Sequence, residues 1–328
     1  MSSQAGPTIP TSHNALTSKT SQNYPTPLSP PPPAISKDIE LARAMSASSK
    51  SSLFSLSKSD VIYEDEWLIA VNKPQGIYCE SVLASVPHVL AGDSLAQSGQ
   101  LSDGSQVNPP ELHLANRLDR DTSGVMVITK SHKVAAKFVK AFTEHKVRKT
   151  YIAGCIGSIP NWERITIKSG HGRSKYGAWR VYALSDVGRT LPGGSVIRDM
   201  ETSFEVVSVK GVRSFKQLSE LMKDEENIIV GEEKAVVDGN AVEDEILVRA
   251  SPRSGRTHQI RLHCQYLGIS IRGDIKYEGV YEWKGKTYDG HELHAERLSF
   301  EHPVTGLPVM LQAPLPLWAT QALQQSSN

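Results

Sequence analysis

The chain has 328 residues, of which 39% are hydrophobic, and its 36 lysines and arginines nearly balance its 35 aspartates and glutamates. A chain of this length can bury one large core or two smaller ones, and a net charge of +1 excludes binding of a polyanion through bulk charge alone. The three cysteines are too widely spaced for a zinc site or a disulfide framework, which indicates a reducing compartment. No apolar run approaches the ~20 residues of a membrane-spanning helix, so we expect no membrane partner.

The first 58 residues differ in composition from the rest of the chain. They are rich in Ser, Thr, Pro and Ala, and four prolines follow one another at 30–33. We predict that residues 1–58 are disordered and dispensable for activity, because such a segment buries too little apolar surface to offset its conformational entropy. Few acids with many hydroxyl residues are typical of a transit peptide, but Arg43 is the only arginine. The compartment therefore stays open between the cytoplasm or nucleus and a plastid or mitochondrion.

From Val61 onward, short strands and helical stretches alternate. An apolar strand is predicted at 67–71, and residues 80–112 are expected to be loop-rich. A second strand at 125–129 precedes a helix that begins at Ser131. One face of that helix carries apolar residues for packing, and the other is basic, as either a solvated surface or a patch for phosphates. Its apolar residues are Ala135, Phe138, Val139 and Phe142, and its basic residues are Lys133, Lys137, Lys140 and Lys146.

The second half of the chain continues this alternation. β-Branched and aromatic residues predict strands at 151–156, 179–184, 202–209 and 246–250. Residues 212–245 form an acidic insert, with a short helix expected at 215–222 and a hairpin turn at 238–239. Residues 256–267 have a helical pattern. Many strands with few helices indicate an α+β fold.

The segment His113–Gly124 holds the strongest candidate for chemistry. It places Asp119 between Arg117 and Arg120, followed by Thr122 and other small polar residues. Neighbouring guanidinium groups would keep the Asp119 carboxylate ionised and oriented, which a carboxylate nucleophile needs. Taken alone, the same pattern also fits a surface ion pair that closes a turn.

Several separated segments together resemble the RluA-like RNA pseudouridine synthases. The resemblance runs from about Val61 to about Leu317, and the order of its motifs is that of the family. The matching segments are Asp65–Gly76 with its Lys-Pro-x-Gly turn, Asn116–Gly124, Arg148–Tyr151, Gly255–His263, Gly273-Asp274 with Tyr277, Leu293–Ala295, Phe300 and His302-Pro303. The resemblance implies a mixed, largely antiparallel sheet flanked by helices, with a central active-site cleft. We place the catalytic domain at 59–318 and a disordered tail at 319–328, without the extra N-terminal RNA-binding module of some relatives.

The family's site residues carry over by position. The resemblance implies that Asp119 is the catalytic nucleophile, that Arg261 pairs with it, and that Tyr151 stacks on the target uracil. Arg117 would fill the space that a flipped uridine leaves. The remaining expected RNA contacts are Arg120, Thr122, Arg256 and His258. The implied enzyme isomerises uridine in RNA as a monomer without cofactor or metal, and rRNA, tRNA and mRNA all stay open as partners.

Two other functions and one departure from the family qualify this interpretation. A catalytically silent RNA-binding protein would not need Asp119, Tyr151 and Arg261 together. A two-carboxylate hydrolase would need a second acid, for which Asp274 is the only candidate, and a turn or helix cap explains Asp274 better. Asn116 stands where many relatives have His; because Asn also donates and accepts hydrogen bonds, we expect the loop to be preserved.

Overall fold

A computed structural model of the protein describes residues 23–33, 36–97, 111–209, 227–234, 244–277 and 280–325. Its helices are α1 (Ser36–Ser52), α2 (Cys79–Gln97), α3 (His132–Thr143), α5 (Gln259–Tyr266) and α6 (Leu317–Gln325), with short 3-10 turns η1 (Lys58–Asp60), η2 (Leu184–Asp186) and η3 (Ile275–Tyr277). None of these helices is long and apolar enough to cross a membrane.

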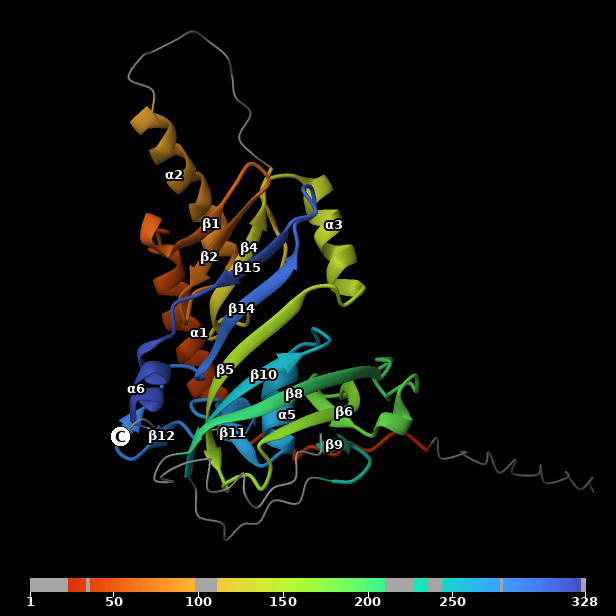
Figure 1. The fold of residues 1–328 in the computed structure, drawn as a ribbon. Coiled ribbons are helices and arrows are strands. Elements are labelled where there is room, and N and C mark those ends of the chain that lie inside the picture. Colours follow the sequence, from red (N-terminus) through yellow and green to blue (C-terminus); the bar gives the residue numbers. More distant parts are fainter. Residues whose placement is uncertain are drawn as a thin grey trace, which may run out of the picture.

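The strands form one large sheet and a small hairpin (Figure 1). They are β1 (Val61–Glu64), β2 (Leu68–Lys73), β3 (His113–Leu114), β4 (Ser123–Thr129), β5 (Arg148–Gly157), β6 (Arg164–Arg173), β7 (Trp179–Tyr182), β8 (Arg198–Val209), β9 (Asn227–Val230), β10 (Asp244–Pro252), β11 (Ile269–Ile271), β12 (Glu282–Trp283), β13 (Lys286–Thr287), β14 (Leu293–Glu301) and β15 (Pro308–Gln312).

The order of the main path is β1-β2-β4-β14-β5-β10-β8-β6-β7. Its pairs are antiparallel except that β14 runs parallel to β4, and β9 at the side runs parallel to β6. The prediction of an α+β fold with a mixed, largely antiparallel sheet is confirmed.

The β4 side of the sheet is covered on both faces. Alternate residues of β4 point to opposite sides, as a period of two requires. Met126 and Ile128 pack with the buried face of α2, whereas Val125 and Val127 pack in the cluster that contains Phe138 of α3. Burial on both faces explains why β2 and β4 read as continuous apolar runs.

The other side of the sheet packs against α5. Ile260 and Cys264 of α5 lie in one core cluster with residues of β5, β6, β8 and β10. The helix thereby lies against the strands on the far side of β14, and in Figure 1 it lies behind β8 and β10. The two halves meet at β14, where the register places Ala295 opposite Gly124 on one side and opposite Tyr151 on the other.

Three predictions about local structure are wrong. Residues 36–52 of the segment expected to be disordered form α1, which buries Arg43, Ala47 and Ser51 at intervals of four. This helix has almost no apolar stripe, because polar side chains dock it, so composition could not reveal it. The expected C-terminal tail begins inside α6, where Ala319 packs against Ile152 and the rest of its core cluster.

The third error concerns the segment 80–112, which we expected to be loop-rich, because its first part belongs to α2 (Cys79–Gln97). Val82, Val86 and Val89 supply a helical stripe that Pro87 and the surrounding Ser and Gly residues obscured. Val139 of α3, assigned to the packing face, is instead exposed. In the acidic insert, residues 227–230 form β9, and the helix at 215–222 and turn at 238–239 lie outside the described residues.

Candidate active site

A cavity of about 630 Å³ opens at the junction of the two halves of the sheet. It lies beside the strand ends that the register of β14 brings together. Of the eight predicted site residues, seven line it, and only Arg120 does not. The seven are Arg117, Asp119, Thr122, Tyr151, Arg256, His258 and Arg261.

Asp119 is bound to Arg261 at the floor of this cavity. Arg261 Nη1 donates to Asp119 Oδ2 at 2.7 Å, while its Nε and Nη2 donate to both carboxylate oxygens of Asp274 at 2.6 and 2.8 Å. The Asp274 side chain is 1% exposed and that of Asp119 is 30% exposed. One guanidinium therefore bridges a fully buried carboxylate and one that faces the cavity.

This arrangement keeps Asp119 ionised. Burial alone would raise the pKa of Asp119, but the adjacent charge of Arg261 holds that pKa well below its usual range. The same two causes leave the pKa of Asp274 lowered. Both carboxylate oxygens of Asp274 accept hydrogen bonds from Arg261, so Asp274 orients the guanidinium. Asp274 is therefore not a second acid facing the cavity, and the site lacks the acid pair that a two-carboxylate hydrolase needs.

The loop that carries Asp119 is held from behind by Lys73. This lysine is fully buried, and its Nζ donates to the carbonyls of Pro74, Ile77 and Arg120 at 2.7–2.9 Å. Thr122 N donates to Asp119 O at 3.1 Å, which closes the turn. The Thr122 hydroxyl lies 2.7 Å from His291 Nε2, so Thr122 has a positioning contact inside the protein.

Gly124 is the last residue of the Asn116–Gly124 motif, and its position requires glycine. Its φ is +111°, and a Cβ on this residue would lie 2.2 Å from the carbonyl oxygen of Ala295. Only glycine lets β4 approach β14 this closely. The glycine thereby fixes the distance between the Asp119 loop and Tyr151, because Tyr151 pairs with Ala295 on the opposite side of β14.

Two histidines and a tyrosine near Asp119 are neutral at pH 7. Burial lowers the pKa of His258 to about 3 and that of His291 to about 4. Burial, together with the Asp119 charge, raises the pKa of Tyr151. Tyr151 is therefore a phenol rather than a phenolate. His258 has a left-handed backbone conformation and is the N-cap residue that precedes α5. Its Nδ1 is hydrogen-bonded to the Tyr277 hydroxyl at 2.7 Å, and its Nε2 lies 3.8 Å from Asp119 Oδ2.

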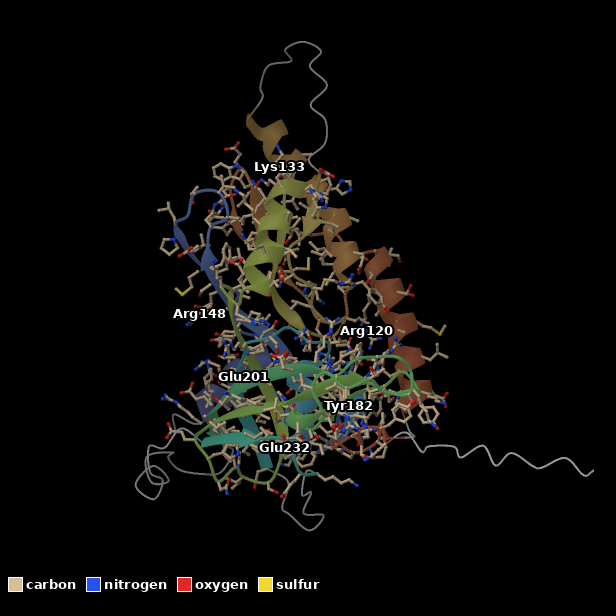
Figure 2. All side chains as sticks on the ribbon, turned by 90° about the vertical axis from the view of Figure 1, so that its right-hand side faces the viewer. Arg120, Lys133, Arg148, Tyr182, Glu201 and Glu232 are labelled. Carbon is tan, nitrogen blue, oxygen red and sulfur yellow. The ribbon has the colours of Figure 1, made fainter. Side chains whose placement is uncertain are left out.

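The structure corrects the idea that the flanking arginines hold Asp119. Arg117 lies 2.8 Å from Glu80, and its side chain is 72% exposed at the cavity wall. Arg120 forms a bidentate pair with Asp121 at 2.7 Å and faces away from the cavity, towards α1 (Figure 2). Asp119 and Arg120 belong to the turn that the Thr122 N–H closes, and their side chains bind different partners, so the neighbours of Asp119 in sequence are not its partners in space.

Several cavity residues were missed at the level of sequence. Lys149 lines the wall and donates from Nζ to Ser254 O at 2.6 Å, and burial, with the nearby charge of Arg256, lowers its pKa to about 8. Arg198 also lines the wall. Lys149 belongs to the Arg-Lys-Thr-Tyr motif and could have been found there, whereas Arg198 has no motif to mark it.

Asn116 has a structural role. Its Oδ1 accepts from Val127 N at 2.7 Å, and its Nδ2 donates to Val125 O at 3.3 Å, which ties the loop to β4. Both an acceptor and a donor are used, as expected for Asn in this position. In the parts of the chain that the structure describes, no group of three His, Cys, Asp or Glu residues is placed to hold a metal ion.

Comparisons with known proteins identify the family of the chain. Residues 67–266 match the family model described as RNA pseudouridylate synthase. The chain is 62% identical over 313 residues to RNA pseudouridine synthase 1 of Arabidopsis thaliana, an alignment that covers 95% of this chain and 92% of that protein. It is 28% identical over 276 residues to ribosomal large subunit pseudouridine synthase C of Escherichia coli K12, covering 82% and 70%.

Solved structures show the same fold. Human RNA pseudouridylate synthase domain containing 1 aligns with a TM-score of 0.53 at 19% identity and covers 80% of this chain and 87% of its own. Human RNA pseudouridylate synthase domain containing 4 aligns with a TM-score of 0.50 at 18% identity, with 88% and 98% covered. On the family match and the level of identity to the plant protein, the chain belongs to the RluA-like family of RNA pseudouridine synthases and is an isomerase that acts on RNA.

Proposed function

We propose that this isomerase uses Asp119 as its nucleophile, needs no cofactor, and acts on a uridine of ribosomal or transfer RNA. The observation that carries the first part is the bridge from Asp119 through Arg261 to Asp274. It supplies an ionised carboxylate at the floor of a cavity with its second oxygen left for substrate. A nucleophile of this kind splits one difficult step into two easier ones.

The reaction is an isomerisation, so all atoms of the uridine are retained. The bond between N1 and the sugar C1′ breaks, the uracil turns, a bond forms from C1′ to C5, and the proton on C5 is replaced by one on N1. Attack of Asp119 on the ring, attack on the sugar, and removal of a sugar proton through a glycal all begin from the same ionised carboxylate. The three routes remain alternatives within this proposal.

The surrounding residues fit the remaining requirements. Tyr151, on the opposite side of β14 from the Asp119 loop, lies where its ring can stack on a uracil in the cavity. As a protonated phenol it can donate but cannot act as the first base. Entry of the base requires flipping of the nucleotide, at a cost of a few kcal/mol. We assign the filling of the vacated stack to Arg117, and its support is that the exposed guanidinium belongs to a residue that lines the cavity.

RNA contacts would come from the cationic wall of the cavity. Lys149, Arg198 and Arg256 line it, and Arg256 is fixed by two hydrogen bonds to Asp199. Such a local cluster can bind phosphates although the whole chain has a net charge of only +1. The basic face of α3 is exposed, but Lys140 lies within 4 Å of Glu144, which reduces the attraction of this face for phosphate. Lys146, which was expected on the same helix, follows its end at Thr143 and also contacts Glu144.

Sequencing of carbodiimide-treated RNA tests the proposal. Total RNA is incubated with wild-type protein or with the Asp119→Asn variant, and pseudouridine is mapped in both; cells with and without the protein give the in vivo comparison. We expect sites in rRNA or tRNA that are formed by the wild type alone. Modification by the Asp119→Asn variant within about tenfold of the wild-type rate would refute Asp119 as nucleophile. Sites confined to messenger RNA would refute the proposed target.

A further inference from the structure

Helix α1 lies outside the segment that matches the family model, yet it contacts the back of the active site. The family match begins at residue 67, whereas α1 spans Ser36–Ser52. Figure 2 shows Arg120, the residue after Asp119, beside this helix. Glu40 of α1 lies 3.7 Å from Arg120 Nη2. The helix therefore reaches the Asp119 loop on the face opposite the cavity.

Arg43 makes the second contact between α1 and the back of the active site, and it is more deeply buried than Glu40. Its side chain donates from Nη1 to Gly273 O at 2.8 Å and from Nη2 to Tyr288 O. Gly273 directly precedes Asp274, the residue that orients Arg261. A charged side chain that is 9% exposed needs strong partners to offset its desolvation, and two carbonyls with the neighbouring Asp121 carboxylate supply them.

The segments that Arg43 joins are closely packed. Gly273 has a φ of +76°, and a Cβ there would lie 2.2 Å from the carbonyl oxygen of Gly290. Gly290 precedes His291, which binds Thr122 in the Asp119 loop. A shift at Gly273 would thus reach Asp119 by two paths, one through Asp274 and Arg261 and the other through His291.

We propose that α1 is part of the catalytic unit and that Arg43 is a positioning residue, which fixes the Asp274 turn and the His291 segment around Asp119. This proposal rests on the role assigned to Asp119. It replaces the expectation that residues 1–58 are dispensable. Residues 23–33 contact the other half of the sheet, since Leu28 N donates to Val181 O at 2.8 Å and Arg180 Nε donates to Ser29 Oγ at 3.0 Å.

The test compares Arg43→Ala, Arg43→Lys and Lys50→Ala, the last being a matched control that removes a positive charge from an exposed position of the same helix. Single-turnover and steady-state rates of pseudouridine formation are measured per folded protein. We expect Arg43→Ala to lower kcat about tenfold or more with KM within about threefold, because loss of orientation affects the chemical step more than binding. Arg43→Lys should recover part of kcat, since lysine keeps the positive charge but loses the planar fork that reaches Gly273 O and Tyr288 O from two different nitrogens. Lys50→Ala should behave as wild type.

Two outcomes would overturn the proposal. In one, Arg43→Ala has wild-type kcat per folded molecule and loses only thermal stability, so that the residue is merely structural. In the other, Arg43→Lys has the same kcat as Lys50→Ala and the wild type. This second outcome decides the question even when Arg43→Ala does not fold. An active Asp119→Asn variant in the same assay would instead refute the proposed nucleophile, so the two failures are distinguishable.

Discussion

Replacement of Arg261 gives the sharpest test of the active-site electrostatics. In the native protein this side chain makes three charge-assisted hydrogen bonds, one to Asp119 and two to Asp274. Methionine removes all three and leaves two carboxylates without their common counter-charge. Lysine keeps the charge, but a single ammonium cannot reproduce the planar fork that binds one carboxylate while reaching the other.

The magnitudes follow from these contacts. A hydrogen bond to a charged group contributes about 1.5–3 kcal/mol, so losing the contact that aims Asp119 should lower kcat/KM about 30-fold in Arg261→Lys. In Arg261→Met the fully buried Asp274 loses its partner as well, which costs about 3–5 kcal/mol of folding stability unless the carboxyl takes up a proton. Arg261→Met should therefore be both slower and less stable than Arg261→Lys.

The pH dependence separates loss of charge from loss of shape. In the wild type, the pKa of Asp119 lies well below its usual range, so the carboxylate stays ionised and kcat/KM should show no acid limb from Asp119 between about pH 5 and 8. Without Arg261, burial raises the pKa of Asp119, and the protonated, unreactive form accumulates as pH falls. Activity of Arg261→Met should then rise with pH across this range.

His258 and His291 also respond to Arg261, because its charge adds to burial in lowering their pKa values. Adding His258→Asn or His291→Asn to Arg261→Met removes each of these titrating groups in turn. If the acid limb persists in both double variants, it belongs to a carboxylate rather than to a histidine. Wild-type rates and flat profiles for both Arg261→Lys and Arg261→Met would show that Arg261 does not partner Asp119, and the site as described would be wrong.

Three further predictions concern binding, flipping and the loop. Burial lowers the pKa of Lys149 to about 8, so RNA affinity should fall as pH rises from about 7 to 9 in the wild type, and by less in Lys149→Met, as measured by fluorescence anisotropy at constant salt. Arg117→Ala should lower kcat on a structured RNA at least about tenfold more than on an unstructured oligonucleotide, since less flipping energy is needed there; equal losses on the two substrates would contradict a role in flipping. Lys73→Met removes the ammonium that donates to Pro74 O, Ile77 O and Arg120 O, and of these Arg120 O keeps the Gly76 N–H as a second donor. The change should lower the free energy of unfolding by about 3 kcal/mol, which urea denaturation would measure, and an unchanged midpoint would contradict the role assigned to Lys73.

The sequence predicts an element when the composition of that element reflects its own burial. This holds for the apolar runs of β2 and β4, which are buried on both faces, and for the amphipathic pattern of α3, which is buried on one face. Helix α1 could not be predicted in this way. It is docked by Arg43, whose partners lie 230 and 245 residues away in the chain, and by the polar side chains of Glu40 and Ser51.

The site shows the same division. Motifs identify Asp119, Tyr151 and Arg261 because each stands in a segment with its own signature. The role of Asp274 could not be found in that way, since Gly-Asp before a short turn fits a cap equally well. Only the fold shows that both its oxygens are used on Arg261.

The loop that carries Asp119 links the active site to contacts elsewhere in the fold. Asp119 faces the cavity and takes its partner from 142 residues away, whereas Arg120 faces outward and takes Asp121 and Glu40 as partners. Two oppositely directed contacts hold one short loop, so a change on its outer face can move the carboxylate on its inner face. Interiors packed this closely transmit small displacements. Because Gly124 also allows no movement towards β14, the geometry at Asp119 depends on residues on both sides of the loop, including some that make no contact with the cavity.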